Sequence, residues 1–144
     1  MVSPFVGTPP PSPKRPRPPN LVFAAGIIWS AIGALGILGA LVLTNMLRGA
    51  AGMVAAAIPA LISLAFLYVG VSTIRGKAPD TLGNGVGSIG IGVLGIVAVV
   101  LSLVEGMSVI STVIQSLALI VAGWLALAAR GDYQRWRERH ADRL

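Results

Sequence analysis

Two overlapping copies of the glycine spacing G-x-G-x-x-G lie in residues 83–95, the segment GNGVGSIGIGVLG. The first copy is Gly85, Gly87 and Gly90, and the second is Gly90, Gly92 and Gly95. In a dinucleotide-binding unit this spacing follows a strand, opens a helix and precedes an acidic residue by about 20 positions. Glu105 stands at that distance from Gly85, but no strand pattern precedes the glycines. The sequence therefore predicts no cofactor here and favours glycines that pack helices.

On a helix, where each residue turns by about 100 degrees, the glycines fall on two opposite faces. One face holds Gly83, Gly87 and Gly90, and the other holds Gly85, Gly92 and Gly95. Helices in lipid associate through close backbone packing, so small residues mark their contacts. A helix that is smooth on two faces is expected to lie between two neighbours. We therefore predict that this third apolar helix is central.

A polar stripe is predicted on the fourth apolar segment. It consists of Ser108, Ser111, Thr112, Gln115 and Ser116, and Glu105 projects onto the same face. Two interpretations remain open. The side chains hydrogen-bond to neighbouring helices, each bond contributing about 0.6–2 kcal/mol. Alternatively, Glu105, Ser108, Thr112 and Gln115 line a polar vestibule for an ion, a proton or a ligand. No second acid or base lies within any apolar segment, which favours the structural interpretation.

Residues for catalysis or metal binding are scarce. His140 is the single histidine, and the chain has no cysteine. Neither a Cys/His zinc cluster nor a Ser-His-Asp set can be assembled from these residues. The acids Asp80, Asp132, Glu138 and Asp142 stand among basic residues and are read as members of local ion pairs. The sequence predicts no enzymatic activity, no metal and no cofactor.

The elements that would position these residues are four uncharged segments of 24 to 27 residues. About 20 apolar residues suffice for a helix to cross the hydrocarbon of a bilayer. The predicted spans are residues 21–47, 50–74, 81–104 and 107–129. The chain is 55% hydrophobic and only 11% charged, too few charges to coat a soluble domain of 144 residues. We expect an all-α fold, an integral membrane four-helix bundle made of two hairpins in a 21–130 transmembrane domain.

Basic residues predict the orientation of this bundle. Ten of them fall on the side that carries both termini, and Arg48 falls on the other. By the positive-inside rule, both termini are cytoplasmic in a multi-pass protein of the cell membrane. The net charge of +6 then indicates contact with anionic lipid headgroups rather than with nucleic acid. Trp124, Tyr133 and Trp136 are predicted to anchor the chain at the membrane interface.

The two tails differ in composition. Residues 1–20 hold eight of the ten prolines, which predicts a disordered, basic cytoplasmic tail. Residues 131–144 predict a short basic amphipathic helix, with Tyr133, Trp136 and His140 on the side that touches lipid. Between the spans, Gly76 is placed for a left-handed helix cap and Asp80 for an N-cap.

An internal duplication is one interpretation of the apolar segments. The sequence IGALGI at residues 32–37 resembles IGVLGI at residues 91–96. The Arg-Gly pairs at 75–76 and 130–131 correspond less well in offset. A duplicated hairpin in parallel orientation would place a pseudo-twofold axis along the membrane normal. Chance similarity in so restricted an alphabet stays the alternative.

These patterns favour a non-enzymatic membrane protein that serves as a scaffold, an accessory subunit or an interaction module. It would work with a membrane-protein partner or as a homo-oligomer. The alternative function is a small oligomeric transporter or channel that uses the polar stripe of the fourth span. A holin-like pore is a third interpretation, supported by the span count and the basic tail alone.

Overall fold

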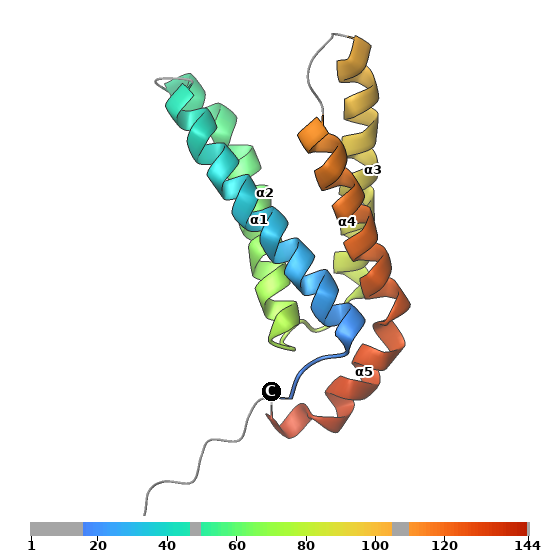
Figure 1. Ribbon diagram of the computed structural model, residues 1–144. Helices are drawn as coiled ribbons and strands as arrows, with labels where there is room; N and C mark the ends of the chain where they lie inside the picture. The colour runs from blue at the N-terminus through green and yellow to red at the C-terminus, as the bar shows by residue number, and fades with distance from the viewer. Residues whose placement is uncertain (1–15, 47–49, 105–109, 144) are drawn as a thin grey trace, which may run out of the picture.

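The computed structural model describes residues 16–46, 50–104 and 110–143, and Figure 1 shows their arrangement. Five α-helices follow one another: α1 (Asn20–Met46), α2 (Ala50–Ile74), α3 (Leu82–Val104), α4 (Ile110–Ala128) and α5 (Arg130–Arg139). A short 3-10 turn, Ala141–Arg143, ends the described part, which contains no strand. The predicted all-α fold is confirmed. The predicted disorder of the proline-rich tail falls mainly outside the described residues.

Helices α1 to α4 are long and apolar enough to cross a membrane. Their bounds lie within one residue of the predicted spans, except that α4 begins at Ile110, directly after residues outside the described part. In each helix only 17% to 28% of the apolar segment is buried inside the chain. Large side chains such as Leu38, Ile58 and Leu94 are exposed. So much apolar surface is stable in lipid rather than in water.

The four long helices form two antiparallel hairpins, α1–α2 and α3–α4 (Figure 1). The hairpins approach each other at the end where α5 lies and diverge toward the other end. The main contact between them is made by α1 and α4. The prediction that α3 is central is therefore wrong, because α3 packs chiefly against its own hairpin partner. A Cβ added at Gly83, Gly87 or Gly90 would meet nothing within 4 Å, so no described residue packs closely against these glycines.

Glycine allows the backbones within each hairpin to touch. A Cβ on Gly33 would lie 2.6 Å from the carbonyl oxygen of Ser63 on α2. On the other hairpin, a Cβ on Gly92 would lie 2.7 Å from the carbonyl oxygen of Ser116 on α4. Gly85 and Gly95 face α4 in the same way. This glycine face of α3 makes the close helix contact that membrane helices use in place of a hydrophobic driving force.

The close contacts of the two hairpins correspond residue by residue. Equivalent positions are 59 apart on α1 and α3, and 53 apart on α2 and α4. The pairs are Gly26 and Gly85, Gly33 and Gly92, Gly36 and Gly95, Ser63 and Ser116, Leu67 and Ile120, and Gly70 and Gly123. This agreement supports the duplication, with two parallel hairpins related by a pseudo-twofold axis along the helices. The sequence carries its second signal as S-L-A-x-x-x-x-G at 63–70 and 116–123. The Arg-Gly pairs are two positions out of this register.

Of the two caps predicted in the connection between the hairpins, Gly76 is confirmed. The N-cap of α3 is Thr81, whose carbonyl accepts from the N–H of Gly85, so the predicted Asp80 lies one residue too early. Gly76 takes a positive φ of 69°, and its N–H donates to the carbonyl of Thr73. The N–H of Lys77 donates to the carbonyl of Ser72, which completes the left-handed C-cap of α2. Asp80 accepts hydrogen bonds from the N–H groups of Thr81 and Leu82 at the start of α3. The chain therefore turns from one hairpin into the next within a few residues.

Candidate functional site: the cleft between the hairpins

A cleft of about 420 Å³ lies between the hairpins and is lined by residues from all four long helices. Six of the lining residues form three equivalent pairs in the duplication: Ile32 and Ile91, Ile62 and Gln115, and Phe66 and Leu119. A site lined by both members of each pair lies on the pseudo-twofold axis itself. Most of the lining comes from α1 and α2, and Ile91, Gln115 and Leu119 complete the cleft from the second hairpin. We refer to it as the axial cleft.

Gln115 is the one of these six residues that breaks the apolar character of the axial cleft. Its equivalent on α2 is Ile62, so the two hairpins present different chemistry to the same space. Gln115 is five residues into α4, about 7.5 Å along the helix from Ile110. Its side chain is exposed to the cleft rather than packed in the protein. An amide in hydrocarbon is costly unless a partner satisfies its hydrogen bonds.

The rest of the predicted vestibule does not assemble among the described residues. Thr112 is exposed and does not line the axial cleft. Glu105 and Ser108 lie outside the described residues. Ser116, on the same predicted stripe, is buried against the glycine face of α3. The described part of the stripe therefore does not face one site, because α4 is turned so that Ser116 packs against α3 while Ser111 and Thr112 are exposed.

A hydrogen-bonded relay ties the hairpins together one turn nearer to the α5 end. Trp29 is fully buried, and its Nε1–H donates to the hydroxyl of Ser88 at 2.9 Å. The Ser88 hydroxyl in turn donates to the carbonyl oxygen of Leu119 at 2.6 Å. Trp29 and Ser88 occupy equivalent positions of the duplication, so the bond crosses the pseudo-twofold axis. Sequence reasoning missed this contact, although an indole N–H inside an apolar helix needs a partner.

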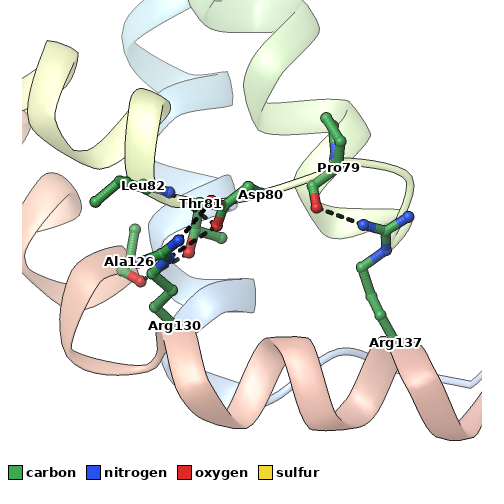
Figure 2. Close-up of polar contacts among 7 residues, drawn as sticks. All are labelled: Pro79, Asp80, Thr81, Leu82, Ala126, Arg130 and Arg137. Carbon is green, nitrogen blue, oxygen red and sulfur yellow. Dashed lines mark hydrogen bonds and ion pairs between the residues drawn. The ribbon is translucent and has the colours of Figure 1, made fainter.

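A second polar cluster closes the α5 end, as Figure 2 shows. Arg130 donates two hydrogen bonds to the Asp80 carboxylate. Its Nε lies 3.1 Å from Oδ1, and its Nη2 lies 2.9 Å from Oδ2. The hydroxyl of Thr81 donates to the carbonyl of Ala126 at 3.1 Å, and Arg137 donates to the carbonyl of Pro79. These contacts clamp residues 79–81 onto α4 and α5. We call this cluster the latch.

The latch perturbs the titration of its own groups. The hydrogen bond from Arg130 lowers the pKa of the Asp80 carboxyl below its ordinary value of 3.8. The same bond raises the pKa of the Arg130 guanidinium. Both groups are partly exposed, which limits what the pair contributes to stability. The latch is therefore ionised at neutral pH and has the character of a structural tie.

Two of the predicted interface anchors have a different role in the structure. Tyr133 is fully buried and Trp136 is 6% exposed, so the expectation that they face lipid is wrong. They stack with ring centroids 5.7 Å apart and pack with Val22, Ala78 and Ala129. The Tyr133 hydroxyl donates to the carbonyl of Ala78 at 2.8 Å, and burial raises the pKa of that phenol. The apolar face of α5 thus fastens the helix to its own chain.

Trp124 differs from them, since it is 63% exposed on the outer face of α4. Its role as an interface anchor stays a prediction. Among the described residues, no group of three or more His, Cys, Asp or Glu side chains could hold a metal ion. Comparison with protein-family models, with curated proteins and with solved structures found no match.

Proposed function

We propose that this chain is a non-enzymatic accessory subunit or interaction module of the cell membrane, and that the axial cleft receives a transmembrane helix of a partner protein. The observation that carries the proposal is the amide of Gln115, exposed in a cleft that α1, α2 and α3 line with apolar or small residues. Lipid chains offer this amide no hydrogen bond. A partner helix can offer a backbone carbonyl or a polar side chain.

Small residues on α1 support a helix as the occupant. Gly36, Gly39 and Ala40 line the cleft on that helix, and a Cβ on Gly39 would meet nothing within 4 Å. An open glycine inside a cleft permits the close backbone approach typical of membrane helix pairs. The hairpins diverge away from α5 (Figure 1), and the axial cleft lies between them.

The proposed orientation places the latch and α5 in the cytoplasm. Arg75, Lys77 and Arg135 are exposed at that end, which carries nearly all the basic residues of the chain. Short cytoplasmic loops are enriched in Lys and Arg. A reporter fused after residue 144 should therefore be active only as a cytoplasmic form.

The test is photocrosslinking in native membranes from a benzophenone residue at Gly39. We expect one discrete adduct of fixed stoichiometry. Gln115→Leu should abolish it, whereas Thr112→Val, a polar-to-apolar change outside the cleft on the same helix, should leave it unchanged. Equal adducts from both variants would overturn the role of the amide. Adducts with lipid alone would overturn the partner helix.

Transport is the competing function. The same cleft with its amide could pass a small polar solute if several copies assembled. Flux through reconstituted protein that is sensitive to Gln115→Leu or Glu105→Gln would support that function over an accessory role. We expect no flux above empty vesicles, because the described residues that line the axial cleft include no acid or base.

A further inference from the structure

A groove of about 250 Å³ runs between α2 and α3, next to the axial cleft. On α2 it is lined by Ile62, Ala65, Phe66 and Val69, and on α3 by Gly83, Asn84, Gly87, Ser88 and Ile91. From Gly83 to Ile91 it follows nine residues of α3, a length of about 12 Å. Apart from Asn84 and Ser88, the lining is apolar or has no side chain.

The duplication explains why this groove is open. Its equivalent in the other half is the contact between α1 and α4, where Ala25, Trp29, Leu119 and Ala122 are buried together. At the α3 positions equivalent to Ile28 and Trp29, the chain carries Gly87 and Ser88. The space that an isoleucine and an indole occupy in one half is therefore left empty in the other. Helices α2 and α3 also approach each other less closely than α1 and α4 do, and the small residues at these two positions add to the open space.

Charge at one end of the groove indicates what it would hold. Gly83 and Asn84 mark its end nearest to the α2–α3 connection, which carries the exposed residues Arg75 and Lys77. The two ion pairs formed among the described residues involve neither of them. The segment that connects the two walls of the groove is therefore basic, which matches the chemistry of an anionic lipid headgroup above an acyl chain.

We propose that the groove between α2 and α3 binds one acyl chain of an anionic phospholipid, with the headgroup phosphate held by Arg75, Lys77 and the amide of Asn84. A flexible chain adapts to a narrow groove of this volume, since an apolar cavity of about 150 Å³ already accepts benzene. The side chain of Ser88 is already engaged, because it accepts from Trp29 and donates to Leu119. The Ser88 hydroxyl is therefore not assigned to the headgroup, whose contacts are with Arg75, Lys77 and Asn84.

The experiment uses Trp29 as a reporter, since its indole is hydrogen-bonded to Ser88 on the groove wall. The full chain with Trp124→Phe is titrated in micelles with phosphatidylglycerol that carries brominated acyl chains, or with brominated phosphatidylcholine. The emission of Trp29 is obtained by subtracting the emission of the same chain that also carries Trp29→Phe. We expect half-maximal quenching at about tenfold less of the anionic lipid, because basic residues near an anionic headgroup each add to binding.

Two matched variants separate the groove from general contact with lipid. Gly87→Ile introduces at this position the residue that its equivalent, Ile28, has in the other half. The isoleucine should fill the groove, so quenching should fall to the level of non-specific contact with lipid. Gly90→Ile, on the same helix and outside the groove, should quench like the unmodified chain. A Cβ at either glycine meets nothing within 4 Å, so both variants should fold, with helical content checked by circular dichroism.

The headgroup is tested by the double change Arg75→Gln and Lys77→Gln, which should remove the preference for phosphatidylglycerol while quenching by either lipid persists. Equal quenching in Gly87→Ile and Gly90→Ile would overturn the acyl-chain site. Equal affinity for the two lipids in the unmodified chain would overturn the headgroup contacts. A dimer that Gly87→Ile abolishes, with no lipid preference, would show a second copy to be the occupant and would also overturn the proposal.

Discussion

The glycine face of α3 permits a prediction in which sign and size both follow from the geometry. Gly92→Ala places a Cβ 2.7 Å from the carbonyl oxygen of Ser116 and 2.7 Å from Cγ1 of Ile120. The first neighbour is backbone and cannot turn away, so α3 and α4 must move apart. Gly90→Ala, two residues earlier, places its Cβ in open space.

Both substitutions gain helix propensity, but only Gly92→Ala also overpacks a helix contact. Replacing glycine by alanine inside a helix stabilises it by roughly 0.5–1 kcal/mol. Overpacking a close contact costs about 1–3 kcal/mol. Gly90→Ala should therefore be neutral or stabilising, whereas Gly92→Ala should lower the free energy of unfolding by up to about 2 kcal/mol once the helix gain is subtracted.

The assay is unfolding in mixed micelles, followed by circular dichroism, with the two variants compared under one set of conditions. The duplication supplies an internal repeat of the test. Gly33→Ala, with a Cβ 2.6 Å from the carbonyl oxygen of Ser63, should behave like Gly92→Ala, and the open Gly39→Ala should behave like Gly90→Ala. The reasoning is refuted if Gly92→Ala and Gly90→Ala shift stability by the same amount in the same direction.

Three further predictions concern the polar contacts. Trp29→Phe removes the hydrogen bond to Ser88 and should destabilise the chain by about 0.6–2 kcal/mol in the same unfolding assay, whereas Trp124→Phe on the exposed face should have little effect. Asp80→Asn should lower stability at neutral pH, with a difference from the unmodified chain that shrinks in acid. The Asp80 pKa is lowered by Arg130, so the carboxylate stabilises the fold above its ordinary pKa of 3.8 and this effect is lost as pH falls through the lowered value. Tyr133→Phe leaves the buried carbonyl of Ala78 without its donor and should cost about 1–3 kcal/mol, visible as faster proteolysis after Arg130; unchanged cleavage would show that α5 is held by its ring contacts alone.

The positions of the helices were predicted from the sequence, but much of their packing was not. The absence of charge over four long segments sets the number and length of the spans, because the bilayer imposes that length. Gly76 was predictable as a C-cap because a cap depends on a few neighbouring residues, whereas the N-cap of α3 lies one residue later than predicted, at Thr81. The neighbours of α3 were not predictable, since a small residue marks where a helix can touch and does not say which helix does so. Gly87 and Gly85 look alike in sequence, yet only Gly85 faces α4.

The axial cleft and the latch required the fold. Gln115 was recognised as a polar residue in an apolar helix, but its position on the pseudo-twofold axis depends on the pairing of the two hairpins. Tyr133 and Trp136 were assigned to the lipid interface because amphipathic rings favour it. Instead they bury against Val22 and Ala78, contacts between residues far apart in the chain. The constant offsets of 59 and 53 were present in the sequence, and both repeats together would have indicated the duplication.

The central claim is that the duplicated hairpins meet through α1 and α4 and remain open between α2 and α3. The chain has no cysteine, so disulfide crosslinking in native membranes can compare two equivalent pairs directly. Ala25→Cys with Ala122→Cys probes the buried α1–α4 contact, and Asn84→Cys with Val69→Cys probes the same positions across the groove. The structure predicts rapid crosslinking of the first pair and little of the second. Equal rates, or a faster second pair, would contradict it.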